Sequence, residues 1–276
     1  MRIERVRSPG GVEAWLVRQT HLPIVALSFA MGGGSAQDPQ DRPGLANMLT
    51  AMLDEGAGER DAEAFSRAME ERAIQLSFSA TRDHLSGSMR MLSEHRMQAF
   101  ALLKDALTRP RFDPAPMERI RQSLLSTLRR RTTTPGAMTG DAFWQIGFAG
   151  HPYARQTIGT LEGVAAITRD DLVAMHRKLV SRAGLKVAVV GDIEPAELAA
   201  VLDDVFGGLP AQSGAGPVPA TALAGLGQRQ IIPIDVPQAT ISFGMPGLLR
   251  EDDDFVTAFV VNHVLGGGSF SSRLYQ

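Results

Sequence analysis

Histidine is the residue of this chain best suited to acid–base or metal chemistry, because the sequence contains no cysteine. Imidazole binds zinc and transfers protons near neutral pH, but a metal site needs several ligands at matched spacing. No two histidines have a His-x-x-x-His spacing, and no two share a face of an expected helix. The six are His21, His84, His95, His151, His176 and His263. We therefore expect no zinc site built on histidine and no metal cofactor in this chain.

The segment 42–54 has the pattern of a helix with one apolar and one polar side. The apolar side is expected to pack into the core and is formed by Leu45, Met48, Leu49, Met52 and Leu53. Asn47, Thr50 and Ala51 fall on the other side, and we expect them to face a cleft. None of these three is a good zinc ligand, since zinc sites use imidazole, thiolate or carboxylate groups.

Composition places the chain among ordinary globular proteins, with 44% hydrophobic and 21% charged residues over 276 positions. A formal net charge of −2 gives no electrostatic basis for binding nucleic acid. Arg129, Arg130 and Arg131 end an expected helix, where their charge complements the helix dipole. We expect no membrane span, because no apolar run approaches about 18–20 residues. A periplasmic location after removal of a signal peptide is one expectation, and a cytoplasmic location is the alternative.

Two segments of the sequence resemble each other at an offset of 214 residues: 23–33 and 237–247 share Pro, Ser-Phe, Met and Gly in register. Chance likeness between two buried strands is the alternative to a repeat. A repeat predicts a complete first domain over 1–206, a Gly/Pro-rich linker over 207–228, and the truncated beginning of a second, homologous domain over 229–276. We expect the last of these to contain a strand and a helix without sheet partners, which are disordered, dock on the first domain or pair with another copy.

The order of expected elements indicates an α+β fold with a mixed, largely antiparallel sheet packed against helices. Residues 74–80 alternate between apolar and polar side chains, which predicts a hairpin with one face on the core. Strands are expected at 12–17, 24–31, 74–80, 85–91 and 185–190, and helices at 42–54, 61–72, 94–108, 114–131, 136–148, 168–180 and 195–206.

The segment 44–53 resembles the metal-binding helix of insulinase/pitrilysin-type zinc peptidases, in which His-x-x-Glu-His occupies the places of Asn47, Thr50 and Ala51. Further segments resemble the same family in order along the chain. They are 110–114, 118–119, 150–153, 159–160, 168–172, 190–192, 206–210 and 265–274. The family's two successive, similar domains fit the offset between the repeated segments.

The departures from this family determine what the resemblance implies. Active members use two His and one Glu as zinc ligands and a second Glu to activate water. Asn47 and Ala51 replace the two histidines, and Thr50 replaces the general base. Alignment of the segment 112–114 puts Ser126 or Thr127 at the third ligand. The resemblance therefore implies a chain that does not hydrolyse peptides by itself.

The family also contains heteromeric processing peptidases in which one subunit carries zinc and a related subunit does not. The resemblance implies that this chain is such a non-catalytic subunit, which forms a peptide-cleaving chamber with a homologous zinc-bearing subunit. In such subunits a Gly-rich loop helps to guide the peptide substrate. A short version of this loop is expected at Gly266, Gly267, Gly268, Ser269 and Phe270. The alternative for this stretch is a helix end followed by a flexible connector.

The family's substrate-gripping Arg and Tyr are expected beyond Gln276, and Arg273 and Tyr275 are not taken for them. Two alternatives to the heteromeric subunit stay open at this point. One is a proteolytically inactive structural or peptide-binding scaffold without a catalytic partner. The other is an active peptidase with ligands that do not follow the family motif.

Overall fold

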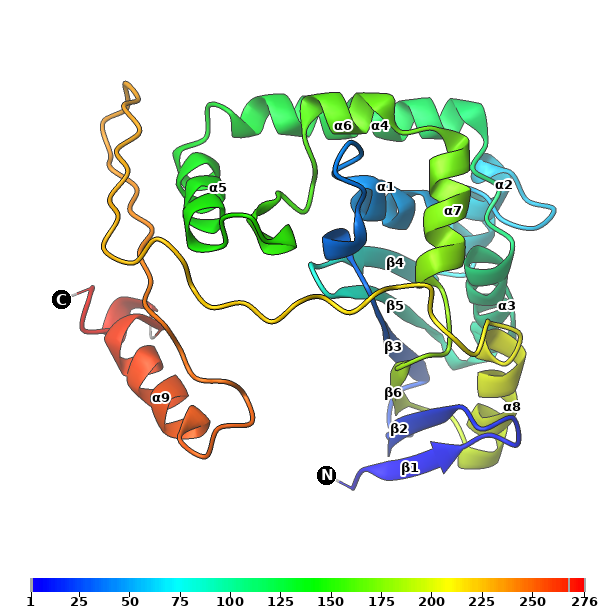
Figure 1. Ribbon diagram of the computed structural model, residues 1–276. Coiled ribbons are helices and arrows are strands. Elements are labelled where there is room, and N and C mark those ends of the chain that lie inside the picture. Colours follow the sequence, from blue (N-terminus) through cyan, green and yellow to red (C-terminus); the bar gives the residue numbers. More distant parts are fainter. Residues whose placement is uncertain (1, 268, 276) are drawn as a thin grey trace.

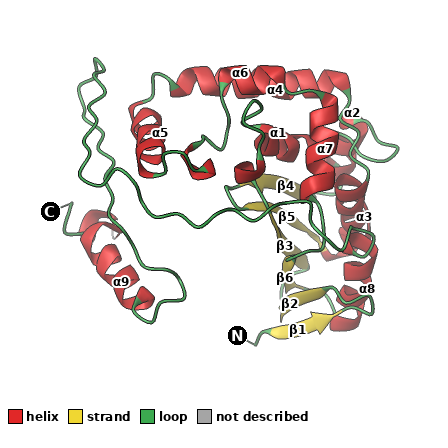
Figure 2. Ribbon diagram, viewed as in Figure 1, coloured by secondary structure: helices red, strands yellow, loops and turns green. Residues whose placement is uncertain are grey.

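A six-stranded mixed sheet forms the centre of the computed structural model, which describes residues 2–267 and 269–275 (Figures 1 and 2). Its strand order is β1-β2-β6-β3-β5-β4. Only β2 and β6 pair in parallel among the paired strands of the described residues. The strands are β1 (Glu4–Arg7), β2 (Glu13–Arg18), β3 (Ile24–Gly32), β4 (Gln75–Ala80), β5 (His84–Leu92) and β6 (Lys186–Gly191). The predicted α+β class with a largely antiparallel sheet is confirmed.

Helices cover one face of this sheet and leave the other face open. In β6 buried and exposed side chains alternate strictly, as expected for a strand with one face against the core. The helix α1 contacts β4, α3 contacts β5, and α8 contacts β1 and β2, while α4, α6 and α7 pack around α1 (Figure 1). The helices are α1 (Leu45–Met52), α2 (Ala62–Glu70), α3 (Arg96–Thr108), α4 (Pro114–Arg131), α5 (Pro135–Gly147), α6 (Leu161–Ala166), α7 (Arg169–Leu179), α8 (Pro195–Phe206) and α9 (Phe255–Asn262).

The short helix α6 was not expected from the sequence. It has six residues, and Gly163 among them lowers its helix propensity. A local cap compensates in part, because the Thr160 hydroxyl accepts a hydrogen bond from Gly163 N at 3.0 Å at the start of the helix. Arg121 of α4 donates to the carbonyl oxygens of Val164 and Ile167, at 2.6 and 2.8 Å. The guanidinium group thereby satisfies carbonyls that a helix end leaves unpaired.

The hydrophobic core of the described residues begins at Val6 and ends at Leu209. Backbone hydrogen bonds hold the segment 214–224 against the part of the chain that forms this core. Gly214 N donates to Lys178 O at 3.0 Å, and Ala224 N donates to Gly147 O at 2.7 Å. The domain boundaries at residues 206 and 229 stay a prediction of the sequence. No helix in the described part of the chain is long and apolar enough to cross a bilayer.

The expectation of a strand in 237–247 is wrong, because the structure contains no strand among residues 229–254. A strand needs a hydrogen-bonded neighbour, and this segment is not paired with either free edge of the sheet, β1 or β4. The expected helix is present as α9, with apolar side chains that remain largely exposed: Val256 is 70% and Phe259 62% exposed. We refer to residues 229–275, without the undescribed position 268, as the apolar arm.

Truncation of the chain after residue 228 is expected to leave the thermal midpoint of the remaining unit within about 2 °C of the intact chain, because the arm contributes no buried apolar side chain. Circular dichroism melting of both proteins provides the measurement. As a matched control, truncation after residue 207 removes Leu209 from the core and is expected to lower the midpoint. A large loss of stability in the first truncation would contradict the independence of the unit from the arm.

Candidate functional site

The beginning of α1 is fixed by a buried carboxylate outside the helix. Asp38 accepts hydrogen bonds from Gly44 N at 2.8 Å and from Ala46 N at 2.9 Å. These are N–H groups that the first turn of a helix leaves unpaired. Arg155 donates to the Asp38 backbone oxygen at 2.8 Å and orients the loop that carries the carboxylate. Gly44 itself has a φ of 96° and lies against the backbone of Ile158, a place that a Cβ atom would not fit.

The three positions of α1 that lie opposite its apolar side differ in how deeply they are buried. Asn47 and Ala51 are half-buried, whereas Thr50 is buried. The Thr50 hydroxyl donates to the Asn47 backbone oxygen at 2.9 Å and so satisfies itself within the helix. Of the three side chains expected to face a cleft, only Asn47 belongs to the residues described as lining one.

This cleft has a volume of about 610 Å³ and lies between α1, α5, the end of α4 and the turn that joins β4 to β5. In Figure 1 the helix α5 lies to the left of α1, and the sheet lies below α1. Three lining side chains carry charge: Arg82, Arg131 and Asp141. The remaining lining residues are Asn47, Gly136, Ala137, Gly140, Trp144, Gln156, Thr157 and Ile158. We refer to this hollow as the α1–α5 cleft.

Arg82 is held in the turn between β4 and β5 by contacts with α5 and the segment after it. Its Nε donates to Tyr153 O at 3.0 Å, and its guanidinium carbon lies 3.5 Å from the centre of the Trp144 ring. Burial lowers the pKa of Arg82 below its ordinary value. The Tyr153 hydroxyl donates to Asp83 Oδ1 at 2.6 Å, and burial followed by this bond raises the pKa of Tyr153 to about 12. These contacts tie the hairpin turn to α5.

Arg131, the last residue of α4, forms the second cationic side of the cleft. Its Nη2 donates to Asp141 Oδ1 of α5 at 2.7 Å, which connects the two helices. Its Nε is buried and has no hydrogen-bond partner among the described residues. From the sequence pattern, the expected role of this arginine was to complement the helix dipole at the end of its helix. The pattern gave no signal for the cleft, because Arg82, Arg131 and Trp144 are brought together only by the packing of α5.

The third predicted ligand position lies on α4, outside the α1–α5 cleft. Ser126 is exposed and is not among the residues described as lining the cleft. Thr127, the alternative for this position, is half-buried and precedes Arg131 by one helical turn, on the same side of the helix. In the described part of the chain, no group of three or more His, Cys, Asp or Glu side chains is arranged to hold a metal ion.

The predicted substrate-guiding loop lies far from α1 in Figure 1. Gly266 and Gly267 end a π-helical turn, His263–Gly267, that directly follows α9, and both glycines are exposed. Phe270 is 77% exposed, and its ring packs edge-on against Tyr275 with centroids 5.1 Å apart. Gly268 lies outside the described residues. Ser269 begins a short 3₁₀ turn. The structure does not bring this stretch to the α1–α5 cleft.

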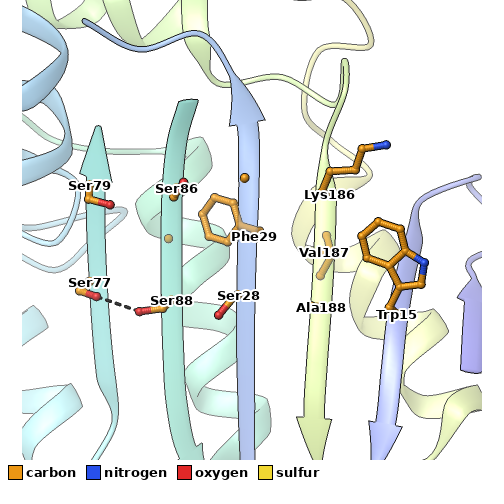
Figure 3. A pocket seen from close by; sticks show the side chains of 12 residues that line it. Trp15, Ser28, Phe29, Ser77, Ser79, Ser86, Ser88, Lys186, Val187 and Ala188 are labelled. Carbon is orange, nitrogen blue, oxygen red and sulfur yellow. Dashed lines mark hydrogen bonds between the residues drawn. The ribbon is translucent and has the colours of Figure 1, made fainter. Parts of the chain in front are cut away.

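A second hollow of about 370 Å³ lies on the open face of the sheet. Figure 3 shows its lining, which combines serine side chains of β3, β4 and β5 with Trp15 of β2 and Lys186 of β6. The hydroxyls of Ser77 and Ser88 hydrogen-bond across neighbouring strands at 3.0 Å. The serine hydroxyls alternate with apolar groups in this hollow, where Trp15 remains 48% exposed.

The fold and the α1 region are those of the insulinase class of peptidases. Residues 16–161 match the model of the family described as Insulinase (Peptidase family M16), and residues 166–276 match the model described as Peptidase M16 inactive domain. The chain belongs to the M16 family, which confirms the resemblance seen in the sequence.

Curated relatives are similar over nearly the whole chain. The non-peptidase homolog YmxG of Helicobacter pylori is 27% identical, covering 92% of this chain and 59% of its own length. The probable mitochondrial-processing peptidase subunit beta of Schizosaccharomyces pombe is 23% identical, covering 91% of this chain and 56% of its own length. The chain thus spans a little over half the length of these two relatives.

Solved structures share the fold. A peptidase M16 inactive domain from Pseudomonas fluorescens matches with a TM-score of 0.84 and 23% identity, over 100% of this chain and 67% of that one. Pitrilysin matches with a TM-score of 0.71 and 20% identity, over 81% of this chain and 24% of that one.

Introduction of zinc ligands tests which α4 position corresponds to the third ligand that the family resemblance implies. The triple variant Asn47→His, Ala51→His, Thr127→Glu is expected to bind one Zn²⁺ per chain with about micromolar or tighter affinity. The matched triple with Ser126→Glu in place of Thr127→Glu is expected to bind far more weakly, because Ser126 is on the exposed side of α4. Zinc titration calorimetry gives both affinities. Equal affinities in the two triples would contradict this geometry.

The capping carboxylate predicts a pH-dependent stability. Burial raises the pKa of Asp38 from 3.8 to about 6, against the opposing effect of its backbone hydrogen bonds. The folded chain therefore binds this proton more tightly than the unfolded chain. The resulting stabilisation is fully present below about pH 4 and is lost as pH rises through about 6, for a total on the order of 3 kcal/mol.

Urea unfolding between pH 4 and 7 measures the slope of the free energy of unfolding against pH. Asp38→Asn is expected to reduce this slope. Asp54 contributes in the same direction, because burial raises its pKa to about 6 as well. The difference between wild type and Asp38→Asn therefore isolates the Asp38 contribution. Identical slopes in the two proteins would contradict the assignment.

Proposed function

We propose that this chain is a non-catalytic subunit of an M16-type zinc peptidase and acts with a homologous subunit that carries zinc. The observation that carries the proposal is the set of side chains on α1. In a fold typical of the family, an amide, a buried hydroxyl and a methyl group occupy α1 where active members have two imidazoles and a carboxylate. Zinc and the activated water would then be supplied by the partner subunit, and both subunits would line the peptide-binding chamber.

The relatives support this proposal in two ways. The Helicobacter pylori relative carries the name of a non-peptidase homolog, and the Schizosaccharomyces pombe relative is named as one subunit of a processing peptidase. A proteolytically inactive, peptide-binding scaffold without a catalytic partner is the second candidate, which the name of the first relative favours. The two candidates differ in whether peptide cleavage by another subunit depends on this chain.

Reconstitution distinguishes the two candidates. The full-length protein is mixed with a homologous subunit that contains His-x-x-Glu-His, and cleavage of a fluorogenic peptide is followed. The proposal expects kcat/KM to rise by about tenfold or more over the partner alone, which corresponds to about 1.4 kcal/mol of barrier.

Two controls locate the activity. A partner with its motif Glu replaced by Gln is expected to abolish cleavage in the mixture, because the general base resides there. This chain alone is expected to give no cleavage. Absence of any gain on mixing would favour the scaffold, and cleavage by this chain alone would overturn both candidates.

A further inference from the structure

We propose that the α1–α5 cleft binds a carboxylate group through Arg82, Arg131 and the Asn47 amide. This inference deepens the proposed function and rests on it for the source of the ligand, a peptide that presents either a C-terminal carboxylate or an acidic side chain. It assigns a binding role to a cleft that shares only Asn47 with the motif positions of α1 and α4.

Arg82 offers donors whose direction is already fixed. Its Nε is used by the Tyr153 carbonyl, and its guanidinium plane lies on the Trp144 ring. Its two terminal nitrogens have no hydrogen-bond partner among the described residues, although the side chain is half-buried and lines the cleft. A guanidinium group immobilised in this way loses little side-chain entropy on binding an anion.

Arg131 also has hydrogen-bonding capacity left. Asp141 occupies one terminal nitrogen, and the buried Nε is without an acceptor in the described part of the molecule. The other terminal nitrogen, Nη1, has no hydrogen-bond partner among the described residues and is not one of the buried unpaired atoms, so it is the donor left for an anionic oxygen in the cleft. Guanidinium groups bind planar carboxylates through two parallel hydrogen bonds, a geometry that suits this ligand class.

The charge of the lining agrees with a single negative charge on the ligand. Two arginines and one aspartate give the lining groups themselves a net charge of +1, and the other polar lining groups (Asn47, Gln156 and Thr157) are neutral. Asp83, next to Arg82 in the turn, also attracts its guanidinium group, but the Asp83 carboxylate accepts the Tyr153 hydroxyl and does not line the cleft. A metal cation is disfavoured by this balance. The Asn47 side chain, for which no hydrogen bond is found in the described structure, adds a donor for a second carboxylate oxygen.

Asp141 competes with the ligand from inside the cleft, since its carboxylate already binds Arg131. Replacement of Asp141 by Asn removes the competing charge and frees Arg131. Replacement of Asp141 is therefore expected to raise the affinity of the cleft for a carboxylate, and replacement of Arg131 is expected to lower it. A purely structural role for the pair predicts instead that both replacements damage the cleft alike.

Trp144 provides a direct reporter of binding. The chain contains two tryptophans, Trp15 and Trp144, so Trp15→Phe leaves the one in the cleft as the only indole. Four N-acetylated hexapeptides are titrated against this protein: one with a free C-terminus, its C-terminal amide, and two amidated peptides that carry an internal Glu or Gln. Binding by the free C-terminus only, or by the Glu peptide only, identifies the source of the carboxylate, and binding by both supports the shared chemistry.

Matched arginine variants locate the site. Arg131→Gln is expected to weaken carboxylate binding by about tenfold, whereas the neighbouring, exposed Arg130→Gln leaves it unchanged. Asp141→Asn is expected to strengthen binding by several fold. Circular dichroism of each variant establishes that the fold is retained, and the gain in Asp141→Asn keeps the test decisive if Arg131→Gln fails to fold.

Three outcomes would overturn the inference. They are equal binding of the carboxylate peptides and their neutral partners, preferential binding of inorganic phosphate in a parallel titration, and absence of any response at Trp144. None of these decides the proposed function, which depends on the gain of peptide cleavage in the reconstituted mixture. If mixing gives no gain in peptide cleavage while the carboxylate peptides still bind, the proposal of a catalytic partner fails and the proposal of a carboxylate site stands.

Discussion

The cleft depends on one buried carboxylate, that of Asp38, to which two backbone N–H groups at the start of α1 donate. This contact fixes where α1 begins and therefore which of its side chains face the sheet and which face α5. Because α1 contacts β4 on one side and α4, α6 and α7 on others, a rotation of the helix would disturb every layer around it. The position of Asn47 in the cleft follows from this cap and from the apolar side chains beneath it.

Most of the fold could be predicted from the sequence, because its strands and long helices have clear apolar periodicity. The alternation in 74–80 correctly indicated β4, and the helix expected over 114–131 is present as α4. Two features could not be predicted from local pattern. The helix α6 is stabilised by Arg121, which is distant in sequence, and the segment 237–247 has strand-like residues but no neighbouring strand to pair with. In both cases tertiary context outweighs local propensity.

The site could be predicted only where a family motif marks it. Asn47, Thr50 and Ala51 were identified from one helix, but the structure separates them by burial, and only Asn47 lines the cleft. The charged groups come from a hairpin turn, from the end of α4 and from α5, segments whose approach no spacing rule specifies. The helix on which the family resemblance predicts missing zinc ligands thus borders a cleft that two guanidinium groups keep charged.

The position of β6 in the sheet has a consequence for how the chain folds during synthesis. This strand lies between β2 and β3, yet it is the last of the six to leave the ribosome. Until residue 191 emerges, the hairpin β1–β2 and the three-stranded unit β3–β5–β4 have no strand that joins them and remain separate. Such long-range closure is slow and leaves strand edges open to wrong partners. The nascent chain therefore passes through a vulnerable interval in which chaperone protection of these edges would have its greatest effect.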